Sequence, residues 1–89
     1  MTETERKLKE LEGIRQMIRE KHPDLNTKDI RHIMIITGYA AGFEIYLIAY
    51  AAGVSEQTVY KLLRKVPIAY EAAKAKRTEI LQLRKKKKV

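Results

Sequence analysis

Side chains that match the edges of nucleic-acid bases recur at helical spacing between residues 56 and 64. One helix face would carry Glu56, Gln57, Tyr60, Lys61 and Arg64. The amide of Gln57 matches adenine N6 and N7, and Lys61 or Arg64 would donate to guanine or to a phosphate. Glu56 would accept from cytosine N4 or complement the helix dipole. Tyr60 would contact a phosphate or a thymine methyl, or pack on the next helix. The pattern predicts recognition, with Gln57, Lys61 and Arg64 as its main contacts.

A helix-turn-helix at residues 43–65 is predicted to position this face. Gly53 suits the left-handed conformation that ends a helix, because it has no Cβ. Ala49, four residues earlier, would let the two helices cross closely, and Ser55 is a typical N-cap for the second helix. The core between the helices is expected to contain Ile48, Val54, Val59, Leu62, Leu63 and Val66.

Positive charge is concentrated in the last third of the chain. Residues 1–60 carry a net charge of −1 and residues 61–89 carry +9, which gives the total of +8. A polyanionic partner follows from this distribution. Beyond the face above, the further predicted DNA contacts are Ser55, Thr58, Lys65, Lys74, Lys76 and Arg77. Residues 85–89 are predicted to form a basic disordered tail, which either adds to the electrostatic attraction or is simply solvated.

The first helix is predicted over residues 3–21 and ends before Pro23. Its apolar stripe contains Leu8, Leu11, Ile14 and Ile18. This stripe would either pair with a second copy of the chain, giving a homodimer through terminal helices, or pack on its own core. Both alternatives are open from the sequence.

The chain as a whole is predicted to be all-α, with about five helices in one domain at 1–84. Thr27 would cap a helix over 28–37, and Gly38 and Gly42 would bracket the following turn. Pro67 suits the first turn of a last helix that runs to about residue 84. The inward side of that helix is expected to carry Ala69, Ala72, Ala73, Ile80 and Leu83. No alternating strand pattern follows residue 65, so no wing is expected.

A membrane span over residues 33–54 is the competing interpretation of the same region. The segment is apolar except for Glu44, and lysines follow it. An acidic residue at the centre of a span costs roughly 2.5–3.5 kcal/mol on insertion scales. The helix-turn-helix explains the same residues better, so no membrane partner is expected.

Enzyme and metal constellations are nearly absent. Ser55 is the only serine and is assigned as a cap, and the chain has no cysteine. His22 and His32 lack the i,i+4 spacing of a helical zinc pair. The sequence therefore predicts no enzyme, no cofactor and no metal. Its composition, rich in Lys, Arg, Glu and Ile, resembles that of hyperthermophile proteins, and a cytoplasmic, nucleoid-associated location is expected.

A resemblance to a known superfamily lies in residues 47–65, LIAYAAGVSEQTVYKLLRK. This segment resembles homeodomain-like helix-turn-helix domains of transcriptional repressors, recombinases and transposases. The resemblance implies DNA contacts at Ser55, Glu56, Gln57, Thr58, Tyr60 and Lys61. The longer segment 51–77 is similar to phage small terminase subunits and phage regulators, which implies a viral or plasmid setting.

Double-stranded DNA is therefore the predicted partner, with a dimeric, sequence-specific transcriptional regulator as the first hypothesis. An architectural or packaging protein with little sequence preference is the second. A protein-interaction module acting through residues 1–21 is the third, and RNA binding is also open. No small-molecule substrate is indicated.

Overall fold

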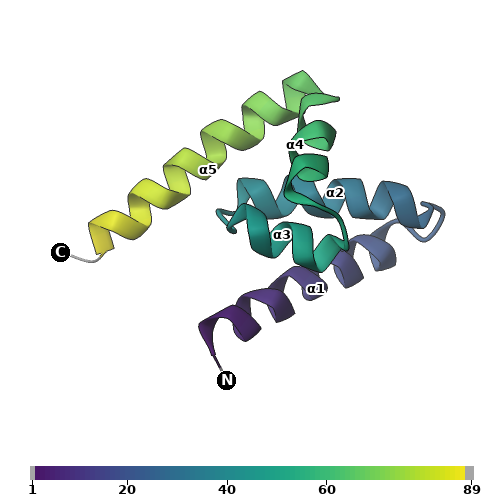
Figure 1. The fold of residues 1–89 in the computed structure, drawn as a ribbon, viewed down its shortest axis with the longest axis horizontal. Coiled ribbons are helices and arrows are strands. Elements are labelled where there is room, and N and C mark those ends of the chain that lie inside the picture. Colours follow the sequence, from purple (N-terminus) through teal and green to yellow (C-terminus); the bar gives the residue numbers. More distant parts are fainter. Residues whose placement is uncertain (1, 88–89) are drawn as a thin grey trace.

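The chain folds into five helices, seen in a computed structural model that describes residues 2–87 (Figure 1). The helices are α1 (Glu3–Lys21), α2 (Thr27–Ala40), α3 (Ile45–Ala52), α4 (Glu56–Arg64) and α5 (Pro67–Lys87). No strand occurs within residues 2–87. The prediction of an all-α fold of about five helices without a wing is confirmed.

Short polar side chains cap the starts of α1, α2 and α4. Thr2 accepts a hydrogen bond from the backbone N–H of Glu5, and Asn26 accepts one from Asp29. The predicted cap of the second helix was therefore wrong by one residue, because Thr27 is already helical. Asn26 caps it better because its side-chain oxygen reaches the free N–H groups of the first turn.

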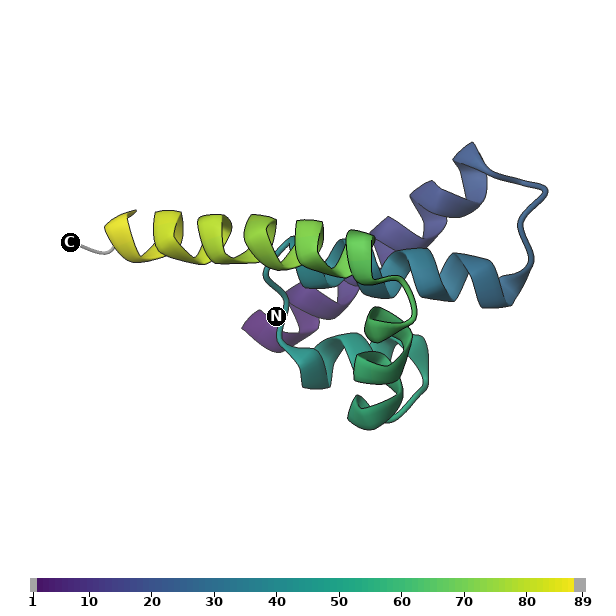
Figure 2. The ribbon, with the colours of Figure 1, turned by 90° about the horizontal axis from the view of Figure 1, so that it is seen from above.

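Helix α2 is longer than expected and lies at the centre of the fold, in contact with the other four helices (Figures 1 and 2). The prediction that Gly38 begins a turn was wrong. Gly38 is buried inside α2, where a Cβ would lie 2.9 Å from Cδ2 of Leu11. The glycine therefore allows α1 to approach α2 closely. The turn comes later, at Gly42, whose φ of 92° favours glycine.

One apolar core joins all five helices. Its fully buried large side chains are Leu11, Met34, Ile35, Ile48, Val59 and Leu63. Ile35 had not been assigned to the core, because the apolar run around it has no clear helical period. Val66 had been assigned there wrongly; its side chain is 39% exposed in the turn before α5.

The apolar stripe of α1 packs against its own chain. Leu11 is 0% and Ile18 is 6% exposed, while Leu8 and Ile14 are half-buried against the same core. Of the two alternatives left open by the sequence, packing on the chain's own core therefore holds for Leu11 and Ile18, which have almost no surface left for a second copy. Leu8 and Ile14 keep part of their surface, and a dimer contact through the stripe stays a prediction.

Helix α5 packs on α2 and α4, and its C-terminal end extends beyond the rest of the protein (Figures 1 and 2). Its inward face carries Tyr70, Ala73, Arg77 and Ile80, whereas Ala72 and Leu83 are exposed, contrary to the sequence prediction. The helix continues to Lys87, past the predicted end at residue 84. Residues 85–87 are thus helical where a disordered tail was expected, and 88–89 lie outside the described residues.

The apolar segment 33–54 is divided between α2 and α3 by the turn at residues 41–44. Among residues 2–87, none of the helices has the length and apolar character needed to cross a bilayer. The membrane-span alternative is therefore not supported.

Candidate nucleic-acid interface on α4

One face of α4 is fixed in the core. Val59 and Leu63 are both 0% exposed, and Leu62 is half-buried. At the end of the helix, Nε2 of His32 on α2 lies 3.1 Å from the carbonyl oxygen of Leu62. These contacts fix the rotation of α4 about its axis, and so determine which side chains face outward.

The turn before α4 has the geometry expected from the sequence. Gly53 is left-handed, with φ 72° and ψ 33°, and its N–H donates to the carbonyls at the end of α3. The N–H of Val54 donates to the carbonyl of Ala49 at 3.0 Å, which closes the helix end. Ala49 is 5% exposed where α3 packs against its neighbours. Ser55 then begins α4 by accepting from the N–H of Thr58 at 3.2 Å.

The outward face of α4 gathers four of the predicted contacts around one shallow surface depression. Its lining consists of Gln57, Tyr60, Lys61 and Arg64. None of these four side chains forms a hydrogen bond or ion pair with another residue between 2 and 85. Their donors and acceptors are therefore available to a ligand. Tyr60 is 38% exposed, which places its ring at the edge of this surface.

The two hydroxyls at the start of α4 are partly committed to the fold. The hydroxyl oxygens of Ser55 and Thr58 lie 2.9 Å apart, and Ser55 also caps the helix. Glu56 is exposed in the first turn, and Lys65 is exposed just after the last. These four residues lie at the ends or the edge of the face, not at its centre.

The predicted basic contacts of α5 separate into two groups. Lys76 is exposed, and Lys74 is exposed with Nζ 5.2 Å from the centre of the Tyr70 ring. Arg77 instead points into the fold. Its Nη1 donates to the carbonyls of Tyr39, at 3.0 Å, and Phe43, at 2.6 Å.

The guanidinium of Arg77 also lies 4.6 Å from the centre of the Tyr39 ring, a cation–π geometry. Arg77 therefore satisfies carbonyls at the end of α2 and in the turn that follows it. Its assignment as a DNA contact stays a prediction that this orientation does not favour, because Nη1 already donates to two carbonyls inside the protein.

Ionisable groups with shifted pKa values lie away from α4. The hydrogen bond from Lys7 to Glu44, 3.0 Å long, raises the pKa of Lys7 above its ordinary value. Burial by itself would raise the pKa of Glu44, but the hydrogen bond and charge of Lys7 outweigh it and lower that pKa. Burial, followed by contact with Tyr70, raises the pKa of Tyr39. The Lys7–Glu44 pair thus favours the charged forms of both groups near the starts of α1 and α3, whereas the shift of Tyr39 reflects its burial near the end of α2.

Comparison of this chain with protein-family models, curated proteins and solved structures finds no match. A function for the chain is therefore inferred from its own geometry and charge.

Proposed function

We propose that this protein binds double-stranded DNA by inserting α4 into the major groove, as a sequence-specific regulator of the homeodomain-like helix-turn-helix type. The observation that carries the proposal is the outward face of α4. It presents Gln57, Tyr60, Lys61 and Arg64 together, without internal partners among the described residues, on a helix held by Val59 and Leu63.

The dimensions and chemistry of α4 suit the groove. An α-helix with its side chains is about 10–12 Å across, and the major groove is about 12 Å wide. The Gln57 amide supplies the paired donor and acceptor that adenine requires, and Arg64 supplies the fork that matches guanine or phosphate. Only Glu56 brings negative charge to the helix, and it lies in the first turn, where the dipole favours it.

Helix α5 favours a second candidate, an architectural or packaging protein with low sequence preference. Between Pro67 and Lys87 it has seven basic and two acidic residues, a net charge of +5. A basic helix that extends beyond the body would bind phosphates of any sequence and supply counterion release. The two candidates differ in whether base contacts by α4 or phosphate contacts by α5 dominate the affinity.

Selection from a random duplex library at about 150 mM salt separates the candidates, because non-specific binding is weak there. We expect an enriched motif for the wild-type protein. Gln57→Ala should then relax the preference at one base position and cost about 1–3 kcal/mol, or roughly 5- to 150-fold in affinity. Gln16→Ala is the matched control, since Gln16 is exposed on α1.

Each outcome of this selection is informative. Retention of duplexes without enrichment would replace the regulator by the architectural candidate. An unchanged base preference in Gln57→Ala would remove Gln57 from the site. Failure of the wild-type protein to retain any duplex would overturn DNA binding altogether.

A further inference from the structure

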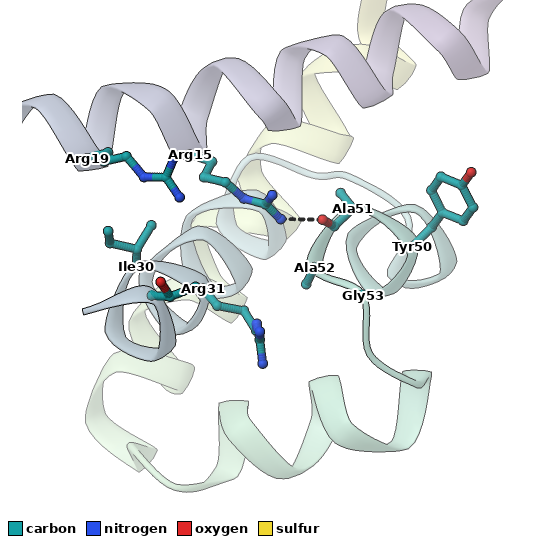
Figure 3. A pocket seen from close by; sticks show the side chains of 9 residues that line it. Arg15, Arg19, Ile30, Arg31, Tyr50, Ala51, Ala52 and Gly53 are labelled. Atoms are coloured by element: carbon teal, nitrogen blue, oxygen red, sulfur yellow. Dashed lines mark hydrogen bonds between the residues drawn. The ribbon is translucent and has the colours of Figure 1, made fainter. Parts of the chain in front are cut away.

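Three arginines line a pocket between α1, α2 and the end of α3. Arg15 and Arg19 extend from α1, and Arg31 extends from α2 toward α4 (Figure 3). The remaining wall includes Thr27, at the N-terminal end of α2, and the end of α3 at residues 50–53. No acidic side chain is part of this lining.

The charge of the pocket is only partly compensated within the protein. Arg15 pairs with Glu12, at 3.4 Å, and donates to the carbonyl of Ala51 at the end of α3. Arg15 therefore has a structural role, because it satisfies a free carbonyl at the negative end of a helix. Arg19 and Arg31 have no hydrogen bond or ion pair with any residue between 2 and 85. Two cations thus share a cavity with a third and repel one another until an anion enters.

The size of the pocket restricts its occupant to a small group. Its volume is about 210 Å³. This exceeds the roughly 30 Å³ share of one water molecule, and lies below the roughly 300–1,000 Å³ of pockets for drug-sized ligands. Guanidinium groups pair in a fork with tetrahedral and planar oxyanions, phosphate in particular. The N-terminal end of α2, represented by Thr27, adds the positive end of a 14-residue helix.

We propose that this pocket binds a phosphate group, held by Arg19 and Arg31 beside the N-terminal end of α2. The group comes either from the DNA backbone or from a free phosphate. Gly53, which lines the pocket, precedes the first residue of α4 by three positions. Three residues of chain span at most about 11 Å, so a DNA strand next to the start of α4 passes within reach of the pocket. Affinity for free phosphate does not require α4 to bind DNA.

The test is a titration of the full chain with inorganic phosphate, monitored by the amide chemical shifts in NMR spectra. A titration with chloride at the same ionic strength is the reference. The pocket variant is Arg19→Gln with Arg31→Gln. The control variant is Lys21→Gln with Lys28→Gln, which removes two charges from the same two helices at exposed positions outside the pocket. We expect saturable shifts around Thr27 and Gly53 in the wild type and the control, and at least tenfold weaker binding in the pocket variant.

A second measurement distinguishes the source of the phosphate. If DNA supplies the group, the salt dependence of duplex binding should fall by about one phosphate contact in the pocket variant, beyond any fall in the control. Saturable phosphate binding with the same salt dependence in both variants assigns the pocket to a free phosphate.

Arg19→Lys with Arg31→Lys, which keeps the charge but loses the fork, should bind phosphate more weakly than the wild type and more tightly than the glutamine variant. Two results together would overturn the pocket assignment. The phosphate-induced shifts would be absent, or spread equally over the basic surface in all variants, and the salt dependence of duplex binding by the pocket variant would equal that of the control. Loss of DNA binding by Gln57→Ala would not affect the phosphate titration, so the two proposals fail separately.

Discussion

Replacing Arg77 by methionine should destabilise the fold, although Arg77 lies in the most basic part of the chain. Its Nη1 donates to the carbonyls of Tyr39 and Phe43, and the guanidinium lies over the Tyr39 ring. One nitrogen makes both hydrogen bonds, so we count them as a single charge-assisted bond of about 1.5–3 kcal/mol. The cation–π contact adds about 0.5–1 kcal/mol. Because Arg77 is half-buried, hydrogen bonds to water replace part of this interaction energy. We expect Arg77→Met to lower the free energy of unfolding by about 2 kcal/mol.

The neighbouring Lys76 provides the matched control. It has the same charge, lies on the same helix and is exposed, and Lys, Arg and Met have similar helix propensities. Lys76→Met should change the free energy of unfolding by less than about 0.5 kcal/mol. Thermal unfolding followed by circular dichroism should show Arg77→Met melting roughly 8–16 °C lower than the wild type, at about 4–8 °C per kcal/mol.

Duplex binding by the same two variants separates the structural role from the DNA contact. Lys76→Met should lower the salt dependence of the duplex affinity by about one phosphate contact if α5 touches phosphates. Arg77→Met should leave this salt dependence unchanged, at a temperature where the variant is folded. Equal stability of the two variants would refute the structural assignment of Arg77. A reduced salt dependence in Arg77→Met alone would restore Arg77 as a DNA contact.

Three further predictions concern the fold that supports α4. Gly13→Ala should stabilise the protein by about 0.5–1 kcal/mol, because Gly13 is helical with open space around it. Gly38→Ala should destabilise the protein instead, since overpacking against Leu11 costs about 1–3 kcal/mol and exceeds the gain in helix propensity. Equal denaturant midpoints for Gly38→Ala and the wild type would contradict this packing. The pair of Lys7 and Glu44 should contribute about 0.2–1 kcal/mol, because it is partly exposed. The pKa of Glu44 is lowered, so its contribution is present above the ordinary value of 4.5 and is lost as the pH falls through the lower, folded value. Acid unfolding of Glu44→Gln should therefore depend less on pH below 4.5 than that of the wild type, and identical profiles would exclude the pair.

The sequence predicted α4 and its turn well, because several independent signals agree there. Gly53 adopts the left-handed conformation, Ser55 caps the helix, and Val59 and Leu63 face the core as their spacing indicates. Each of these features is local, and the helical period of α4 is unambiguous. The same local chemistry therefore placed Gln57 on the outward face.

The rest of the fold depended on contacts between distant residues. Arg77 was expected at the surface because of its charge, but the carbonyls that it satisfies lie more than 30 residues away. Ala73 and Ile80 face inward as predicted, but Tyr70 and Arg77 share that face, and Leu83 is exposed. Gly38 was misassigned for a related reason, because only the approach of Leu11 explains a glycine inside a helix.

The three-arginine pocket was missed for the same reason. Arg15 and Arg19 share a face of α1 at i,i+4 spacing, a pattern that a solvated helix surface also shows. Only the crossing of α1 and α2 brings Arg31 beside them. A spacing of 12 residues across a turn has no local signature, so the sequence offered no basis for the pocket.

The formal charge of +8 is therefore an imperfect guide to where a polyanion binds. Lys7, Arg15 and Arg77 carry charge that is already engaged with a carboxylate or with backbone carbonyls. Lys61 and Arg64 have no such partner within residues 2–85, and they lie on a helix that Val59 and Leu63 anchor in the core. A cation that lacks an internal partner loses none of its own contacts when it binds an anion, whereas an engaged one must first break them. The outward face of α4 groups two such cations with the Gln57 amide and the Tyr60 hydroxyl, which can also contact base edges. It is accordingly a better candidate for the site than α5, even though α5 has more basic residues.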